Sequence, residues 1–377
     1  MTCESIRVLM LDSESSWRGG EAQCQLLMEG LRQRGHVVEL AAPAGSAIAE
    51  RARGAGFHVY PVGFHGGVDL PTAFALRRVI RRGHYHVVHA HASHAHSAML
   101  LACVALPMRP LRVVSRRVDF AVGRGPVAAF KYKQGVDAVL AISTGVQRVL
   151  ERARVDPGRI RLVPSGIDRS RLEHIGDGRA IRREFGIAED TPVVGTIAAL
   201  APHKAQHDLL DAAQGVIASF PGAHFMIVGD GELREALKKH ARRLGIAGSV
   251  VFTGNRTDAE RFFGVFDVFV ISSRLEGLCT SIMDAHTAGV PVAATRTGGI
   301  PDLIEDEMTG LLSPPANTSA LAANILRLLS DRRLATGCVE RAREQSARYD
   351  YHSMVYKTEA AYREFLDMSS SGKALDR

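Results

Sequence analysis

The sequence lacks the features of secreted, membrane-spanning and low-complexity proteins. No apolar run approaches the roughly 18 residues needed to cross a bilayer, and the first residues do not follow the basic and then apolar order of a signal peptide. Five cysteines form no Cys-x-x-Cys pair, which argues against a disulfide framework or a zinc ribbon. Only one tryptophan is present, so a surface that stacks nucleic-acid bases is disfavoured. We therefore expect a cytoplasmic globular protein with reduced thiols.

Charge is uneven along the chain. Residues 1–170 hold 23 Lys and Arg against 13 Asp and Glu, a balance of +10, which leaves −3 for the rest of the total of +7. A basic N-terminal half suits contact with anionic lipid headgroups or a phosphorylated molecule, and it would equally suit nucleic acid. A solvated basic surface without any partner is the alternative that composition leaves open.

Two series of alternating strand-like and helix-like segments fill the chain. The second series starts after a polar stretch that follows Asp168 and has no strand pattern. Such alternation predicts α/β domains with parallel sheets and crossover helices, and 377 residues suffice for two of them. We expect Rossmann-like domains over residues 1–170 and 171–349. The expected strands are 6–11, 37–42, 85–90, 111–115, 136–142, 160–163, 192–197, 224–228, 249–253 and 265–271, and the expected helices include 20–34, 209–220 and 233–244.

The most informative segment is EGLCTSIMDAHTAGVPVAATRTGGIP, residues 276–301. Glu276 follows the expected strand 265–271, so its carboxylate lies near the carboxyl end of a strand. Open parallel sheets bind ligands at that edge. Gly277 lets the backbone approach a ligand closely. The segment therefore predicts a binding site at the sheet edge.

The same segment contains a helix, a strand and a glycine turn. Thr280 or Ser281 is expected to cap a helix that Gly289 ends. A short strand follows over residues 291–294, and the glycine pair 298–299 then forms a turn that can admit phosphate. Two strand ends would thus face one ligand.

This segment resembles the signature of retaining glycosyltransferases of the large family 4 type, which carry a Glu, seven further residues and a second Glu. Glu276 matches the first position, and Asp284, one methylene shorter, stands at the second. The resemblance implies the GT-B fold, in which two Rossmann-like domains face a central cleft and a C-terminal helix, here about 350–377, crosses back onto the N-terminal domain. It also implies that Glu276 contacts hydroxyls of the donor sugar and that Asp284 holds the ribose diol. Backbone amides beside Glu276 would contact sugar and diphosphate, at Gly277, Leu278, Cys279 and Thr280.

Lys204, in ALAPHKAQHDLLDA, resembles the family's phosphate-binding lysine before a helix. A sugar that leaves a nucleoside diphosphate puts growing negative charge on two phosphates, which cations, amides or a metal must offset. The family places an Arg five residues before this Lys, where Ala199 stands here. Arg256, Arg274 or an arginine of the N-terminal domain could supply the missing cation. A solvated lysine at a helix start is the alternative for Lys204.

Two more glycine-containing loops belong to the expected donor site. Gly19 and Gly20, in a WRGGE loop, match the family's glycine-rich loop after the first strand, and their amides can face a phosphate. Gly254 and Arg256, in FTGNR, stand where the family often holds the nucleotide base. A glycine pair alone more often makes only a turn. A similar turn, VGDGE at 228–232, is expected to be structural.

Six histidines stand within residues 84–96. Alternation places His89 and His91 on one face of a strand, and His91 matches the family's histidine that approaches the donor sugar. A metal site made by His89, His91, His94 and His96 is the alternative. Because no Asp, Glu or Cys joins the cluster and GT-B enzymes work without a bound metal, we expect no metal here. His94 and His96 are expected to be ordinary residues of a helix start.

The stretch SRRVD follows another expected strand and contains Arg116, Arg117 and Asp119. These residues are the candidates for binding an anionic acceptor, or for completing the diphosphate site. A surface ion pair is the alternative.

The sequence thus predicts a retaining glycosyltransferase that moves a sugar from a UDP-sugar, or another nucleoside-diphosphate sugar, to a glycan or lipid-linked acceptor. We expect it to act without a cofactor in cell-surface polysaccharide or lipopolysaccharide synthesis, with peripheral contact to the inner face of the membrane through its basic N-terminal domain. Lys204, Glu276 and His91 would lie nearest the chemistry. The alternatives are a GT-B sugar-nucleotide 2-epimerase and a basic lipid- or nucleic-acid-binding module, and the module leaves Glu276 and Asp284 unexplained.

Overall fold

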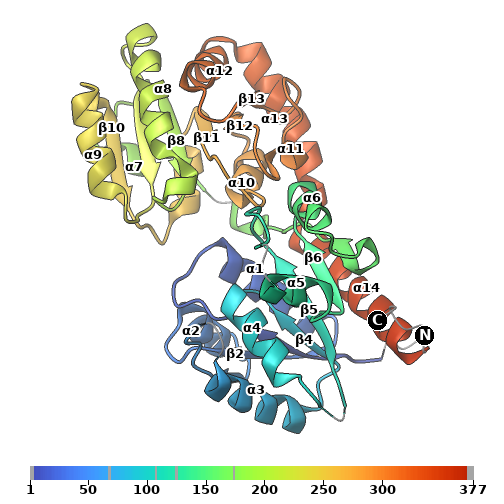
Figure 1. Cartoon of the computed structure of the whole chain (residues 1–377). Helices are drawn as coiled ribbons and strands as arrows, with labels where there is room; N and C mark the ends of the chain where they lie inside the picture. Colours follow the sequence, from blue (N-terminus) through green and yellow to red (C-terminus); the bar gives the residue numbers. More distant parts are fainter. Residues whose placement is uncertain (1–3, 67–68, 107, 124–125, 173–174, 372–377) are drawn as a thin grey trace. The chain divides into compact units, whose positions relative to one another are not determined.

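A computed structural model of the chain describes residues 4–66, 69–106, 108–123, 126–172 and 175–371. The chain divides into two compact units: Met1–Gly166 with Tyr351–Arg377, and Ile167–Asp350. Each unit holds one parallel β-sheet flanked by helices (Figure 1). The predicted α/β class with two Rossmann-like sheets is therefore confirmed. Cys3 and the end of the expected C-terminal helix, 372–377, lie outside the described residues.

The N-terminal unit has a seven-stranded sheet in the order β3-β2-β1-β4-β5-β6-β7. Its central strands are short runs of Val, Leu and Ala that are buried on both faces, as expected for a parallel sheet covered by helices on each side. The strand order reverses between β1 and β4, so their carboxyl ends flank the switch point where such sheets bind ligands. The strands are β1 (Arg7–Leu11), β2 (Val37–Ala42), β3 (Val59–Pro61), β4 (Val87–Ala90), β5 (Leu111–Arg116), β6 (Ala138–Ala141) and β7 (Ile160–Leu162).

The helices of this unit connect its parallel strands. The sequence predicts a loop at Gly19 and Gly20, but α1 already begins at Gly19, because Glu21 accepts the backbone N–H of Arg18 at 2.7 Å and closes the first turn. The helices are α1 (Gly19–Gln33), α2 (Ala47–Gly54), α3 (Leu70–Gly83), α4 (Ser93–Ala102), α5 (Pro126–Lys133), α6 (Thr144–Arg152) and α14 (Tyr351–Ser370).

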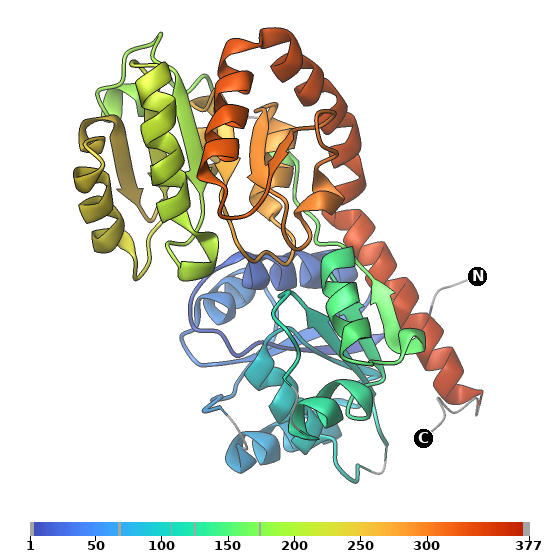
Figure 2. The same ribbon diagram turned by 45° about the horizontal axis from the view of Figure 1, so that its top comes forward.

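Helix α14 comes from the far end of the sequence and packs on α1 of the N-terminal unit (Figure 2). Gly30 of α1 makes this close approach feasible, since a Cβ there would overlap the Cγ2 atom of Val355. Tyr362 and Phe365 are buried in the core of the unit, and the Tyr362 hydroxyl lies 2.6 Å from Nδ1 of His89. The packing of α14 is thus built into the core.

The C-terminal unit has a six-stranded sheet in the order β10-β9-β8-β11-β12-β13, with its switch point between β8 and β11. The strand before Glu276 is shorter than predicted, because residues 259–264 form a 3₁₀ helix and β11 begins only at Val268. The strands are β8 (Val193–Ile197), β9 (His224–Val228), β10 (Val250–Gly254), β11 (Val268–Ile271), β12 (Val292–Thr295) and β13 (Leu311–Ser313).

Helices of two kinds connect these strands. The α-helices are α7 (Arg179–Glu184), α8 (Gln206–Ser219), α9 (Arg234–Arg243), α10 (Thr280–Ala288), α11 (Ile300–Leu303), α12 (Thr318–Ser330) and α13 (Arg332–Ser346). The 3₁₀ helices used below are η2 (Ser170–Leu172), η3 (Pro202–Lys204) and η5 (Ala259–Gly264). Across the residues that the structure describes, we find no helix with both the length and the apolar character needed to span a bilayer.

Candidate active site

Two of the predicted site residues meet at the switch point of the C-terminal unit. Lys204 ends η3 after β8, and Glu276 lies in the loop between β11 and α10. Nζ of Lys204 lies 2.5 Å from Oε2 of Glu276, and the two side chains are only 18% and 10% exposed. A cation and a carboxylate from two neighbouring strand ends are therefore in direct contact.

Hydrogen bonds tie the loops around this pair together. Ser273 donates its hydroxyl to Oε2 of Glu276 at 3.2 Å, and Ser272 donates its hydroxyl to the carbonyl oxygen of Lys204 at 3.0 Å. The backbone N–H of Gly299 donates to the carbonyl oxygen of Glu276 at 3.0 Å. The glycine turn at 298–299 is thereby held beside the Glu276 loop.

Helix α10 begins beside Glu276 without a side-chain cap. The prediction that Thr280 or Ser281 caps it is wrong: Cys279 is the N-cap residue, and its side chain makes no capping hydrogen bond. Burial raises the pKa of the Cys279 thiol to about 11, so the thiol stays neutral at this helix start. Of the first-turn N–H groups, that of Ile282 donates to the carbonyl oxygen of Cys279 at 3.1 Å, so those of Thr280 and Ser281 are left for another acceptor. Gly289, at a φ of 80°, ends the helix as predicted.

The predicted amide donors are placed along this turn. Gly277, Leu278 and Cys279 are buried in the loop, and Thr280 is the first helical residue. A helix start of this kind attracts anions, because its N–H groups and the helix dipole point toward them.

Asp284 lies one turn into α10 and is ion-paired with Arg171 of η2. Burial raises the pKa of Asp284, and the neighbouring guanidinium opposes that rise. Sequence analysis missed Arg171, because it stands in the polar stretch expected to connect the two domains. Its position shortly after Asp168 carries no pattern that points to Asp284.

The two cations proposed to replace the arginine missing at position 199 are held differently. Arg256 contacts two carboxylates, with Nη1 2.7 Å from Oε1 of Glu184 and Nε 2.8 Å from Oδ1 of Asp258. Arg274 contacts one carboxylate, Asp208, through two bonds of 3.0 and 2.9 Å.

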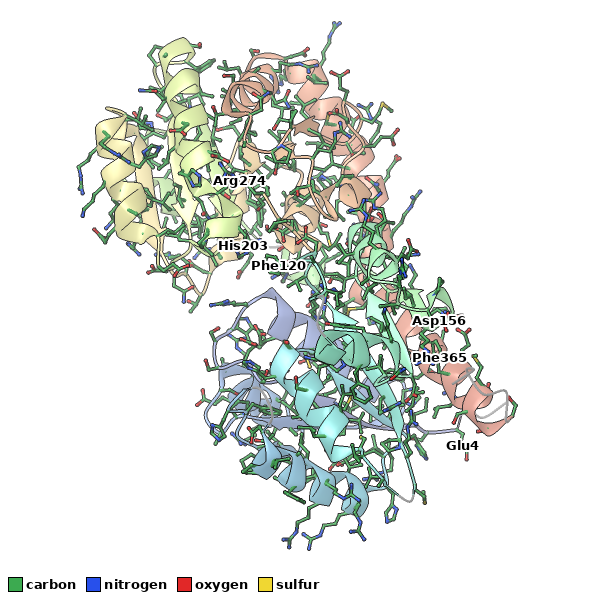
Figure 3. The ribbon with its side chains drawn as sticks, in the orientation of Figure 1. Glu4, Phe120, Asp156, His203, Arg274 and Phe365 are labelled. Atoms are coloured by element: carbon green, nitrogen blue, oxygen red, sulfur yellow. The ribbon has the colours of Figure 1, made fainter. Side chains whose placement is uncertain are left out.

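The backbone of Arg274 also reaches the Lys204 loop. Its N–H donates to the carbonyl oxygen of His203 at 2.8 Å, and both residues are marked in Figure 3. Arg274 is therefore hydrogen-bonded to the residue next to Lys204 in the sequence. Arg256, in contrast, lies beyond the end of β10.

Gly254 and Gly229 have clear packing reasons to be glycine. Gly254 ends β10 at a φ of 78°, and a Cβ there would lie 2.7 Å from Nη1 of Arg234. A Cβ on Gly229 would overlap the carbonyl oxygen of Ala198. The N–H of Gly229 donates to the carbonyl oxygen of Gly254 at 3.0 Å. These glycines close the turns after β9 and β10.

In the N-terminal unit, His91 follows β4 at the switch point and is buried. Nη2 of Arg117 lies 3.2 Å from Nδ1 of His91, and Nε2 of His91 lies 3.4 Å from Sδ of Met10. Because a guanidinium only donates, Nδ1 is the acceptor and the proton of the ring sits on Nε2. Burial lowers the pKa of His91 well below its ordinary value, so the ring is neutral.

Two acids missed by sequence analysis stand around this pair. Asp12 directly follows β1 and is 1% exposed, and burial raises its pKa to about 7. Its Oδ2 atom has no hydrogen-bond partner among the described residues. Burial also raises the pKa of Glu21. Both acids flank the WRGG motif in the sequence, a spacing that could have drawn attention to them. Arg117 is the cation that faces both.

Arg116 is committed to the fold of its own loop. It is the last residue of β5, not the first after it, and it is 6% exposed. Nη1 donates to the hydroxyl of Tyr132 at 2.8 Å, and Nη2 donates to the carbonyl oxygen of Phe120. Asp119 lies half-buried in this loop. Of the predicted SRRVD residues, only Arg117 reaches the switch point at His91.

The remaining histidines have separate partners. His89 lies 2.9 Å from the hydroxyl of Ser115, and Nε2 of His96 lies 3.1 Å from the carbonyl oxygen of Lys131. His94 and His96 are in the first turn of α4, as predicted. Within the described ranges, no three His, Cys, Asp or Glu side chains are grouped as metal ligands.

Comparisons with known proteins identify the family of the chain. It matches the sequence model described as Glycosyltransferase Family 4 at residues 17–171 and the one described as Glycosyl transferases group 1 at residues 177–345. It is 29% identical over 362 residues to a GDP-mannose-dependent α-(1-6)-phosphatidylinositol monomannoside mannosyltransferase of Mycobacterium tuberculosis, covering 90% of this chain and 93% of that one.

Of two further comparisons, one covers about half of the chain and the other shows the fold alone. The chain is 33% identical over 172 residues to the lipopolysaccharide core biosynthesis glycosyltransferase LpsE of Rhizobium meliloti, covering 45% of this chain and 49% of LpsE. The crystal structure of Anabaena HepE in complex with UDP and glucose has the same fold, with a TM-score of 0.84 at 20% identity over 95% of this chain and 99% of HepE. The chain therefore belongs to the GT-B glycosyltransferases of the family 4 type, the glycosyl transferases group 1.

Proposed function

We propose that this glycosyltransferase binds a nucleoside-diphosphate sugar on its C-terminal unit and transfers the sugar with retention of the anomeric configuration. The observation that carries the proposal is the contact of Lys204 with Glu276 at the β8/β11 switch point. There, a cation stands beside an uncapped helix start, so diphosphate and sugar hydroxyls would find donors and an acceptor within one loop cluster.

The mechanism that fits these groups is same-face substitution. Charge develops on the leaving diphosphate, and Lys204 with the first amides of α10 stabilises it. The leaving phosphate oxygen accepts the proton of the acceptor hydroxyl. His91 does not act as the base, because its Nδ1 lone pair is directed at Arg117. The role of His91 at the end of β4 is instead to hold the side chain of Arg117 in place.

Arg274 is the second diphosphate cation in this proposal. It is bound by one carboxylate, Asp208, while Arg256 is neutralised by two. Its backbone bond to His203 places it in the same loop pair as Lys204. Arg274→Ala should raise the donor KM about tenfold, the loss of one charge-assisted hydrogen bond.

The proposed donor is a UDP-sugar. HepE binds UDP, whereas the mycobacterial relative uses GDP-mannose, so both bases occur among similar proteins. Thermal-shift measurements with UDP-, GDP- and ADP-sugars identify the base, because a ligand that binds the folded state raises its melting temperature.

The proposed acceptor is lipid-linked and lies at the cytoplasmic face of a membrane. LpsE acts in lipopolysaccharide core synthesis and the mycobacterial relative acts on a phosphatidylinositol mannoside. Helix α3 supports a membrane contact: Phe74 is 70% and Leu70 is 54% exposed, beside a surface hollow lined by arginines. Apolar side chains with neighbouring cations suit an anionic lipid surface. The arginines of this helix are Arg77, Arg78, Arg81 and Arg82.

Two measurements test the proposal. Donor turnover should fall by about a hundredfold or more in Lys204→Ala, the cost of removing one group that stabilises the developing charge, and comparably in Glu276→Ala. NMR of the transferred sugar should show the donor's anomeric configuration. Near wild-type turnover in both variants would refute the site, and an inverted product would refute the mechanism.

A further inference from the structure

Among the described residues, the ion-pair partner of Asp284 is Arg171, which does not belong to the same helix. Arg171 reaches it from η2, with Nη2 on Oδ1 of the carboxylate, while its own side chain is 43% exposed. Among the described residues, the hydrogen bond to the Asp284 carboxylate is the one from Arg171 to Oδ1, and the Asp284 side chain is 13% exposed. One oxygen is therefore committed to Arg171 and the other is left for a ligand.

Arg171 is needed to keep the carboxylate of Asp284 ionised in its buried surroundings. Burial disfavours the ionised carboxylate, and Glu260 of η5 adds a second negative charge nearby. Helix α10 also packs on α13, β11 and β12, and among described residues only Arg171 and Glu260 act as charged neighbours of Asp284. Arg171 alone offsets both effects, so its loss favours the protonated acid.

We propose that Arg171 is a positioning residue of the nucleotide site: it holds the carboxylate of Asp284 so that Oδ2 accepts hydrogen bonds from the hydroxyls of the donor ribose. This inference rests on the proposed function, because it takes Asp284 as the ribose-binding acid. A diol offers two donors and needs an acceptor fixed in place, and an ionised carboxylate is the strongest acceptor available. The short Asp side chain is fixed from outside the helix by the guanidinium.

The test is nucleotide binding by the full chain as a function of pH. Dissociation constants of UDP, GDP and ADP are measured by calorimetry between about pH 5.5 and 8.5 for wild type, Arg171→Gln and Arg171→Lys. In Arg171→Gln the dissociation constant should rise about tenfold at the acid end, because Asp284 is protonated there, and recover toward the wild-type value at the alkaline end. Arg171→Lys should restore most of the affinity, since it returns the positive charge.

Matched variants separate this role from damage to the fold. Arg169→Gln removes an arginine two residues away and should leave the affinity unchanged at every pH. In Asp284→Asn the affinity should stay below that of wild type at the alkaline end as well, and adding Arg171→Gln should not change it further. Wild-type affinity of Arg171→Gln at all pH values, or a loss that does not vary with pH, would overturn the positioning role. Failure of wild type to bind all three nucleotides would instead refute the proposed function, and this inference with it.

Discussion

Breaking the contact between Lys204 and Glu276 should lower both the stability and the activity of the protein. The double variant should lose less stability than the single variants, but its activity should be as low as theirs. Lys204→Met keeps most of the aliphatic stem and removes the charge. Glu276→Gln keeps the shape of the side chain and removes the opposite charge. The double variant removes both charges, so no buried ion is left without its partner.

The magnitude follows from the burial of the pair. Removing one partner of a fully buried ion pair costs about 3–5 kcal/mol. Here the side chains are 18% and 10% exposed, and Ser273 still donates to Glu276, so we expect about 2 kcal/mol for Lys204→Met. The double variant should lose about 1 kcal/mol or less, because its neutral groups need no counter-charge. Glu276→Gln leaves Lys204 unpaired and should also cost about 2 kcal/mol, so the coupling free energy of the cycle is about 3 kcal/mol.

Urea unfolding followed by circular dichroism gives the stabilities, and release of the nucleoside diphosphate gives the donor turnover. Turnover should fall by about a hundredfold or more in each variant and stay low in the double variant, because restored stability does not restore the cation. Equal stability of Lys204→Met and wild type would show that the contact does not form. Recovery of turnover in the double variant would show that neither charge serves the reaction.

Three further predictions concern backbone, packing and pH. Ala205 has a φ of 48°, so Ala205→Gly should stabilise the protein by up to about 1 kcal/mol in urea unfolding, whereas Ala201→Gly, at a φ of −128°, should not. Gly30→Ala should lower the free energy of unfolding by about 1–3 kcal/mol because its methyl group overlaps Val355, and Val355→Ala should rescue it. Burial raises the pKa of Asp12 to about 7, so the wild-type protein loses stability as the pH rises from about 4 to about 7 and this carboxyl ionises. Asp12→Asn cannot ionise and avoids this loss. It should therefore be more stable than wild type by at most about 4 kcal/mol above pH 7 and equally stable near pH 4. Unfolding of the Gly30 and Asp12 variants can be followed by the fluorescence of Trp17, the single tryptophan. Failure of Val355→Ala to rescue Gly30→Ala would contradict the packing prediction. A gain in stability from Asp12→Asn that does not vary with pH would contradict the pH prediction.

Much of the fold could be predicted because the strands are buried on both faces and read as short apolar runs. Strands such as 111–115 and 224–228 match β5 and β9 within one residue. The errors arise where local contacts decide a boundary. Residues 265–267 belong to the turn after η5 rather than to β11, and the side chains of Val265 and Phe266 pack in the core without joining the ladder. The strand β13 is only three residues long and was missed.

The site was predictable where a pattern lies within one segment, as at Glu276 and Asp284. It was not predictable where partners come from distant segments. Arg171 is 113 residues from Asp284, and Asp12 is 79 residues from His91, so their neighbourhood depends on the sheet order. The commitment of Arg116 to Tyr132 likewise depends on α5 and could not be inferred from the SRRVD stretch.

The most direct measurement is a crystal structure of the protein with the nucleoside-diphosphate sugar selected by thermal shift. The account predicts the diphosphate within hydrogen-bond distance of Nζ of Lys204 and of the first amides of α10, sugar hydroxyls on Glu276, and the ribose diol on Asp284. A diphosphate out of reach of Lys204, with the ribose away from Asp284, would contradict it.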